Sequence, residues 1–142
     1  MRYVIIGNSA AAVGAIEGIR SKDKKGSITL ISMESHHTYS RPLISYLVQG
    51  KTDMHKMKYR PDSFYEDNKI HAMLGKKAVK ILPGITSVIL EDSSAVEYDK
   101  LLVATGSSPF MPPIQGLNDV KRVHTFMTLD DAVNLLEIIN SQ

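Results

Sequence analysis

The chain has 142 residues, of which 43% are hydrophobic and 23% charged, with a net charge of +2 and no cysteine. These values are typical of a soluble, single-domain globular protein that can bury a core. The lack of cysteine excludes disulfides, thiolate metal sites and a redox-active dithiol within these residues. The low charge, without a dense basic cluster, predicts no nucleic-acid partner. With no long apolar span and no room for a cleaved leader before the first strand, we expect no membrane partner and a cytoplasmic location.

The first 34 residues have the layout of a dinucleotide-binding unit. Residues 2–6 (RYVII) predict a buried strand, residues 9–20 a helix, and residues 27–32 (SITLIS) a second strand. The helix N-terminus presents free N–H groups and the positive end of the helix dipole, which favour a pyrophosphate. Glu34 follows Ala12 by 22 residues, close to the spacing of an acid that accepts hydrogen bonds from ribose hydroxyls. The pattern therefore predicts a nucleotide site.

The glycine motif of such units is altered in this chain. G-x-G-x-x-G becomes G-N-S-A-A-A, in which Gly7 permits the sharp turn and Ser9 replaces the second glycine. A serine hydroxyl can itself donate to a phosphate oxygen. An ordinary strand-helix-strand start without a nucleotide is the alternative, and the motif alone does not decide between the two. Gly14 and Gly18 lie four residues apart, so we expect them to bring the helix close to the sheet.

The segment after Glu34 is polar and irregular. Pro42 favours an extended backbone at Arg41, whose planar guanidinium suits a phosphate. His36 and His37 have no second ligand pair at a metal-binding spacing, so we interpret them as exposed loop residues and predict no metal site. Short helices are expected over residues 43–48 and 63–68.

The next part of the chain is rich in strands. They are predicted at residues 70–74, 77–82, 86–91, 95–98 and 100–104, with turns between them. We interpret them as a meander whose last strand, apolar on both faces, returns to the centre of a parallel sheet. That strand ends at Thr105 and Gly106, at the edge where such folds bind ligands. After a proline-rich stretch, Thr128 is predicted to cap a final amphipathic helix that has Asp130 and Asp131 in its first turn.

Three ordered segments together resemble a known family: YVIIGNSAAAVGA with Glu34, TYSRPLIS at residues 38–45, and YDKLLVATGSSPFMPP at residues 98–113. The chain resembles the N-terminal FAD domain of the pyridine nucleotide-disulfide oxidoreductase superfamily. Within it, the chain is similar to the NADH-dependent ferredoxin or rubredoxin reductases and the NAD(P)H-nitrite reductase large subunit. The resemblance implies an α/β, Rossmann-like FAD/NAD(P)-binding fold of three layers. A central parallel sheet would carry helices on one face and an antiparallel β-meander on the other.

The resemblance also implies domains and cofactor contacts. Residues 1–110 would form the FAD-binding domain, and residues 111–142 a Pro-rich connection and helix leading toward an absent NAD(P)H-binding domain. Gly7, Ser9, Ala10 and Ala11 would hold the FAD pyrophosphate. Glu34 would bind the adenosine ribose. Arg41 and Pro42 would lie along the pyrophosphate and flavin, and Val79 would offer backbone groups to the adenine. The full set of expected cofactor-binding residues is Gly7, Ser9, Ala10, Ala11, Glu34, Arg41, Pro42, Val79, Ala104, Thr105 and Gly106.

The implied function is the FAD-binding part of an NAD(P)H-dependent flavoprotein oxidoreductase. NAD(P)H would be the co-substrate, and reduced flavin would pass electrons to an acceptor protein or a small molecule. No residue is nominated as catalytic, because the cofactor carries the chemistry. Without cysteine, the disulfide, peroxide and coenzyme-A chemistry of other members is absent, and Tyr46 replaces a lysine that many relatives have near the flavin. Since the family's later domains are missing, we expect the isolated chain to be inactive.

Two alternatives stay open. One is a non-catalytic, stand-alone nucleotide-binding module or one half of a split enzyme. The other is the NAD-binding Rossmann domain of a dehydrogenase. The dehydrogenase reading explains the first 34 residues equally well, but it does not explain residues 38–45 or the meander that leads to Thr105 and Gly106.

Overall fold

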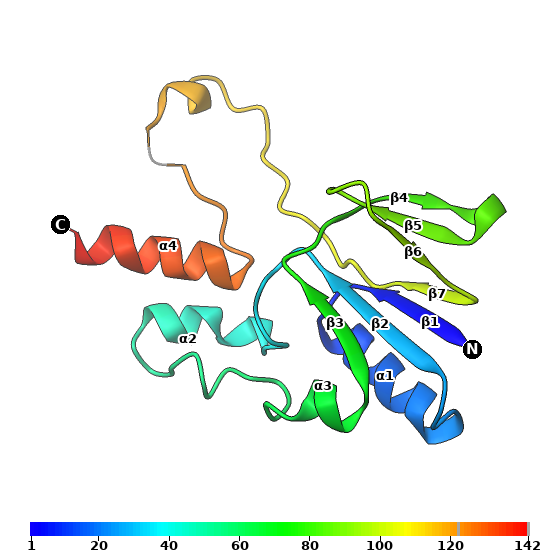
Figure 1. Cartoon of the computed structure of the whole chain (residues 1–142). Coiled ribbons are helices and arrows are strands. Elements are labelled where there is room, and N and C mark those ends of the chain that lie inside the picture. Colours follow the sequence, from blue (N-terminus) through cyan, green and yellow to red (C-terminus); the bar gives the residue numbers. More distant parts are fainter. Residues whose placement is uncertain (122, 142) are drawn as a thin grey trace. The chain divides into compact units, whose positions relative to one another are not determined.

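The computed structural model of the chain describes residues 1–121 and 123–141. It divides into two compact units (Figure 1). The first unit comprises Met1–Tyr39 and Lys58–Gly106, and the second comprises Ser40–Met57 and Ser107–Gln142.

A parallel sheet forms the centre of the first unit. Its four strands are β1 (Arg2–Ile6), β2 (Ser27–Ser32), β3 (Ile70–Leu74) and β7 (Lys100–Val103), in the order β3-β2-β1-β7 (Figure 1). The expectation that β3 belongs to the meander is therefore wrong. A short apolar strand does not reveal its partner, and the long connection after β2 lets β3 run parallel to it.

Strand β7 lies at the edge of this sheet and not at its centre, which corrects a second expectation. It pairs with β1, and no strand within the described residues pairs with its other side. Leu102 and Val103 are accordingly 39% and 54% exposed. The apolar character of this strand correctly predicted membership of the sheet, but it did not predict the strand's position.

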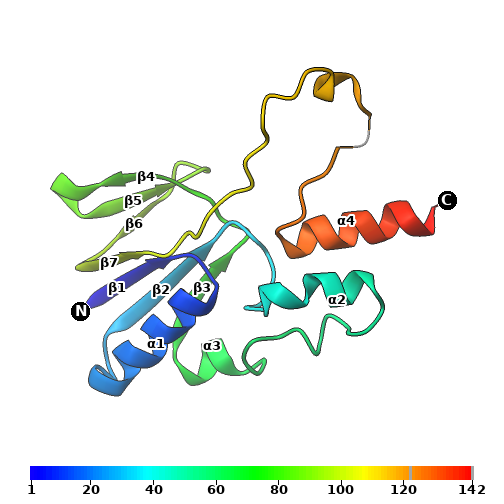
Figure 2. The ribbon, with the colours of Figure 1, turned by 180° about the vertical axis from the view of Figure 1, so that it is seen from behind.

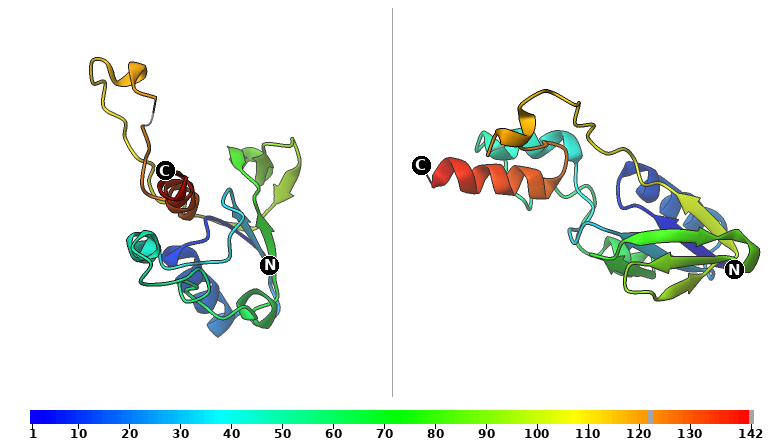
Figure 3. Two further views of the ribbon diagram at one scale, coloured as in Figure 1. Left: turned by 90° about the vertical axis from the view of Figure 1, so that its left-hand side faces the viewer. Right: turned by 90° about the horizontal axis from the view of Figure 1, so that it is seen from above.

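A layer of helices and an antiparallel sheet cover the two faces of the parallel sheet. Helix α1 (Ala10–Lys22) packs on one face, and strands β4 (Ala78–Leu82), β5 (Ser87–Leu90) and β6 (Ala95–Glu97) pack on the other (Figures 2 and 3). Alternate residues of β1 point to opposite faces: Ile5 packs toward α1, whereas Val4 and Ile6 pack toward the antiparallel sheet. Burial on both faces explains the continuous apolar run in this strand. The predicted three-layer fold is confirmed.

The glycines of α1 do not bring the helix close to the sheet. Ala12, Val13 and Ile16 are the buried helix residues, whereas Gly14 and Gly18 are exposed. A Cβ added at either glycine would meet no atom within 4 Å. Gly14 follows Ala12 by two residues, a rotation of about 200° around the helix, which places it on the outer side. The expected role of these glycines is therefore wrong.

The remaining short elements complete each unit. In the first, α3 (Phe64–Asp67) precedes β3, and a 3-10 turn, η2 (Pro83–Ile85), joins β4 to β5. In the second, a 3-10 helix, η1 (Arg41–Leu43), leads into α2 (Ile44–Val48), which lies beside α4 (Leu129–Asn140), and η3 (Leu117–Asp119) lies between Gly106 and α4 (Figure 1). No helix in the described residues is long and apolar enough to span a membrane.

Helix α4 begins as predicted. The hydroxyl of Thr128 accepts the N–H of Asp131 at 3.1 Å, and the Asp131 carboxylate accepts the N–H of Thr128 at 2.9 Å. This reciprocal capping box satisfies two N–H groups that would otherwise lack partners at the helix start. The predicted connection at residues 111–142 groups with residues 40–57 in the second unit, and its residues 122 and 142 lie outside the described part. The assignment of residues 1–110 and 111–142 to two functional parts stays a prediction.

Candidate functional site

The carboxyl ends of three parallel strands meet at one edge of the sheet. The N–H of Gly7, directly after β1, donates to the carbonyl of Ile31 in β2 at 2.8 Å. The N–H of Ala104, directly after β7, donates to the carbonyl of Ile6 in β1 at the same distance, 2.8 Å. Such an edge is where open α/β sheets bind their ligands. The structure therefore brings the turn at Gly7, the end of β2 and the start of residues 104–106 together.

Gly7 is required by this close approach. It has a φ of +121°, and an added Cβ would stand only 2.1 Å from the carbonyl oxygen of Ala104. Any side chain would displace the segment after β7 or the turn itself. The predicted sharp turn is confirmed, and its partner across the gap is Ala104, one of the other residues expected at the site.

The N-terminus of α1 opens at the same edge. Ser9 is the N-cap residue with an extended backbone, and its side chain makes no capping hydrogen bond. Ala10 and Ala11 form the exposed start of the helix, and its first turn contains no acidic residue. The first N–H groups of a helix have no partner within the helix and carry the positive end of its dipole. This arrangement suits an anion such as a pyrophosphate.

Glu34 follows β2 and is held by its backbone and its side chain. Its carbonyl accepts the hydroxyl of Ser32 at 3.0 Å and the N–H of Gly75 at 3.1 Å. Its carboxylate oxygen Oε2 accepts the phenol of Tyr39 at 2.6 Å. The partly exposed carboxylate thus stands just beyond the carboxyl end of β2, in a defined orientation.

A polar network that the sequence did not predict joins the turn after β1 to the loop after Glu34. Asn8 donates from Nδ2 to the carbonyl of His36 at 3.1 Å. The phenol of Tyr65, from α3, donates to Asn8 Oδ1 at 2.9 Å and accepts the N–H of Thr38 at 3.0 Å. Burial raises the pKa of Tyr65, so its hydroxyl stays protonated and donating at neutral pH. The sequence feature that could have indicated this network is Asn8 in the altered glycine motif, because its side-chain amide can both donate and accept hydrogen bonds.

The histidine pair is not exposed, contrary to the expectation from sequence. Both rings are partly buried, and the His37 ring lies against Tyr65 with its centroid 4.6 Å away. The loop was interpreted as solvent-exposed because of its polarity, but Tyr65 from a distant part of the sequence covers it.

Val79 stands at an irregularity in the antiparallel sheet. Ala78 pairs with Leu90 and Lys80 pairs with Ile89, so Val79 has no Cα partner. A β-bulge of this kind leaves the extra residue outside the regular ladder and is common beside functional sites. The geometry agrees with a backbone contact to the adenine, which stays a prediction.

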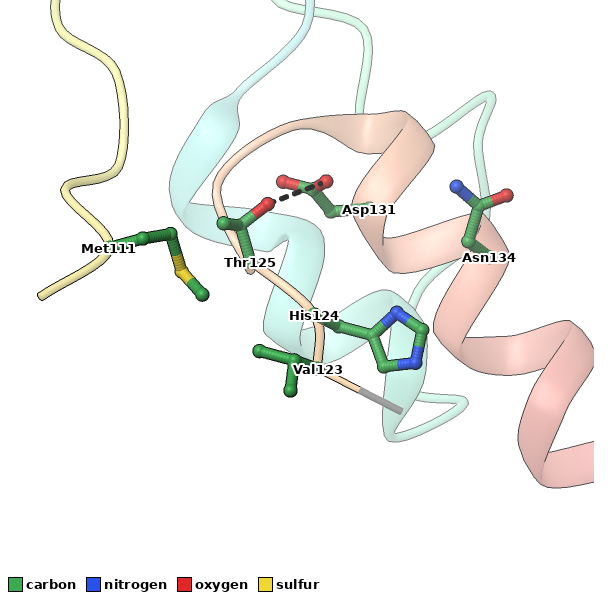
Figure 4. Close-up of a pocket in the computed structure, with 6 residues that line it drawn as sticks. All are labelled: Met111, Val123, His124, Thr125, Asp131 and Asn134. Atoms are coloured by element: carbon green, nitrogen blue, oxygen red, sulfur yellow. Dashed lines mark hydrogen bonds between the residues drawn. The ribbon is translucent and has the colours of Figure 1, made fainter. Parts of the chain in front are cut away.

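An open hollow of about 250 Å³ lies in the second unit and is shown in Figure 4. Asp131 in its wall accepts the hydroxyl of Thr125 at 3.2 Å and the N–H groups of Met127 and Thr128 at 2.7 and 2.9 Å. The hydrogen bonds of this carboxylate therefore stabilise the start of α4. The lining is Met111, Val123, His124, Thr125, Asp131 and Asn134, and it includes none of the predicted site residues.

Comparison with known proteins identifies the family. Residues 1–139 match the family described as pyridine nucleotide-disulphide oxidoreductase. The chain belongs to this family. The predicted resemblance is confirmed, and the reductases of the family use FAD and NAD(P)H.

Relatives of the chain in this oxidoreductase family include a dehydrogenase subunit and a nitrite reductase. The chain is 42% identical over 135 residues to the epsilon subunit of an NADH-dependent phenylglyoxylate dehydrogenase from Aromatoleum evansii, covering 94% of this chain and 32% of that protein. It is 36% identical over 136 residues to a nitrite reductase [NAD(P)H] from Bacillus subtilis, covering 95% and 17%. Putidaredoxin reductase, in its covalent complex with putidaredoxin, superposes with a TM-score of 0.86 at 26% identity, covering 97% and 34%. The chain thus spans about a third or less of each relative.

The other four residues predicted to bind the cofactor are divided between the two units. Thr105 and Gly106 are exposed residues that follow Ala104 after the end of β7. Arg41 and Pro42 belong to the second unit, where Arg41 begins η1 and is not extended, because the first turn of a 3-10 helix tolerates a proline. Its guanidinium Nη1 donates to the carbonyl of Met127 at 2.8 Å. The cofactor contacts of all four residues stay predictions.

Proposed function

We propose that the chain is the FAD-binding part of an NAD(P)H-dependent flavoprotein oxidoreductase. The observation that carries the proposal is the sheet edge of the first unit. There, a turn that admits only glycine, an N-terminal helix end without acidic residues and an acid after the second strand occur together. Membership of the pyridine nucleotide-disulphide oxidoreductase family and the names of the relatives support the same function.

In this function the residues of the chain bind and orient the cofactor. The chemistry that FAD would supply when bound is acceptance of a hydride from the nicotinamide and transfer of the electrons to an acceptor. Ser9 and the N–H groups of Ala10 and Ala11 hold the pyrophosphate. Because Gly7 has no side chain, the turn after β1 packs closely against Ala104 and its backbone can approach the pyrophosphate. Glu34 accepts hydrogen bonds from the adenosine ribose, and Val79, which lies at the register shift between β4 and β5, offers backbone groups to the adenine.

The remaining parts of the enzyme lie outside these residues. We propose that an NAD(P)H-binding domain and a C-terminal domain, on the same polypeptide or on a second chain, complete it. The acceptor is an electron-transfer protein or a small molecule, a proposal supported by relatives named rhodocoxin reductase and rubredoxin-NAD(+) reductase. The lack of cysteine supports a cytoplasmic location.

The experiment is a binding titration of the chain with FAD, followed by flavin fluorescence and by thermal shift. We expect FAD to bind and ADP to compete, whereas FMN, which lacks the adenosine half, does not compete. Glu34→Ala weakens FAD binding by about tenfold, because a hydrogen bond to a charged group is lost. Failure of FAD to bind contradicts the proposal. Tighter binding of NAD than of FAD would instead identify the NAD-binding domain of a dehydrogenase.

A further inference from the structure

The phenol of Tyr39 donates a short hydrogen bond to the carboxylate of Glu34. The phenol oxygen lies 2.6 Å from Oε2 of Glu34, the length expected when a hydroxyl donates to an ionised carboxylate. Such a bond is stronger than one between neutral groups. It connects the acid beyond β2 with a residue five positions further along the chain.

Both ends of this hydrogen bond are anchored to the fold. The backbone of Tyr39 forms an antiparallel bridge with Lys58, and the N–H of Tyr59 donates to the carbonyl of Thr38 at 3.0 Å. Thr38 is fully buried. On the other side, the carbonyl of Glu34 is held by Ser32 and Gly75. The bond therefore links two fixed backbone positions and restricts the rotation of the long glutamate side chain between them.

A carboxylate that is held in one orientation can bind a diol with a smaller loss of side-chain freedom. A free glutamate side chain samples many rotamers, and a ligand that selects one of them loses affinity by doing so. A carboxylate accepts about four hydrogen bonds, so the bond from Tyr39 does not exhaust its capacity. The two adjacent hydroxyls of a ribose are donors that one oriented carboxylate can receive together.

We propose that Tyr39 is a positioning residue that orients Glu34 toward the 2′- and 3′-hydroxyls of the adenosine ribose. In this role it sets the preference of the site for a dinucleotide with an intact ribose diol. The inference rests on the proposed function, because it assigns a determinant of specificity to the same nucleotide site. Tyr39 does not touch the cofactor's reacting atoms, and its effect on binding passes through Glu34.

The test compares FAD with its analogue that carries 2′-deoxyadenosine. Dissociation constants are measured for the wild-type chain and for Tyr39→Phe, Glu34→Ala and the double variant. Tyr39→Phe keeps the ring and removes only the donor. We expect it to weaken FAD binding by about fivefold and to change binding of the analogue by less than about twofold. In the Glu34→Ala background, Tyr39→Phe has no further effect, because the group that it positions is gone.

Tyr59→Phe is the matched control. It removes the hydroxyl of the residue directly after Lys58 of the Tyr39–Lys58 bridge, on a ring that is 39% exposed, and we expect both dissociation constants to stay unchanged. Equal weakening of FAD and analogue binding by Tyr39→Phe would indicate a general structural role and overturn the inference, as would no weakening at all.

The same measurements separate the inference from the proposed function. If Glu34→Ala weakens FAD binding and Tyr39→Phe does not, the site stands and the positioning role is wrong. If Glu34→Ala leaves the affinity for FAD and the preference for the diol intact, the ribose is not bound at Glu34, and both assignments are wrong. A wild-type chain that binds neither FAD nor the analogue overturns both proposals.

Discussion

The two compact units differ in how they bury apolar side chains. In the first, both faces of the parallel sheet are covered, and residues such as Ile5, Ile16 and Leu30 are completely buried. In the second, α2 and α4 bury little besides Ile44, Met57, Leu129 and Ala132. Large apolar side chains stay exposed there. They are Tyr46, Met54, Phe110, Met111, Ile114, Val120, Val123, Phe126 and Ile139.

This difference shows which part of the chain has a self-sufficient core. The nucleotide site proposed here lies on the first unit, which supplies its own core.

Removal of a core side chain should produce the largest contrast between the units. Ile16→Ala deletes a fully buried side chain between α1 and the sheet. We expect a loss of about 4 kcal/mol in the free energy of unfolding, measured by urea denaturation. The control, Ile139→Ala in α4, truncates a side chain that is 52% exposed, and we expect a change below about 0.5 kcal/mol. Similar losses for the two variants would contradict the contrast.

The glycine turn offers a second contrast, within the first unit. Gly7→Ala places a methyl group against the carbonyl of Ala104 at a φ of +121°. We expect a loss of about 3 kcal/mol in unfolding free energy and a further loss of FAD affinity. Gly14→Ala in α1 meets no atom within 4 Å, so it should raise stability by up to about 1 kcal/mol. A neutral Gly7→Ala would show that the turn relaxes without strain.

The smallest expected effect on the free energy of unfolding is that of a substitution in the capping box of α4, in the second unit. Burial alone would raise the pKa of Asp131, but hydrogen bonds from Thr128, Met127 and Thr125 outweigh it and leave the pKa below its ordinary value. The carboxylate therefore stabilises the folded chain fully above its unfolded pKa of about 3.9, and this contribution is lost as the pH falls through the lower, folded-state pKa. We expect Asp131→Asn to lower the unfolding free energy by about 1 kcal/mol at pH 7.

Circular dichroism of thermal unfolding checks this pH dependence. The difference between wild type and Asp131→Asn should be present at pH 7 and should diminish steadily below pH 4. Asp130→Asn, at the neighbouring position in the first turn, is the control with the same change of charge. A difference for Asp131→Asn that stays constant down to pH 2 would show that its ionisation does not contribute.

The local pattern of residues predicted most of the elements. The apolar runs at residues 2–6, 27–32 and 70–74 became β1, β2 and β3 with the same bounds, and Thr128 capped α4 as expected. These features depend on neighbours in the sequence, on strand-forming residues and on the hydrogen-bonding capacity of a single side chain. The family resemblance rested on the same kind of local signal, three short motifs in a fixed order, and the comparisons confirmed it.

Partners across the chain were predicted less well. The sequence marked Arg20 only as the end of a helix, but its guanidinium donates to the carbonyls of Asn68, Asp23 and Gly26 at 2.7, 3.1 and 2.8 Å and so ties α1 to the start of β3. Asn8 and Tyr65 are 57 residues apart and meet only in the folded chain. No periodicity in a sequence encodes such pairs.

The sequence by itself thus determined the strands, the altered glycine turn, the acid at residue 34 and the family. Tertiary structure alone decided that β3 joins the parallel sheet, that β7 lies at its edge and that Gly14 faces outward. It also placed the Tyr39 phenol on the Glu34 carboxylate. The physical reason is the range of the forces involved: propensity and capping act within a few residues, whereas strand pairing, burial and side-chain hydrogen bonds depend on segments that meet only after folding.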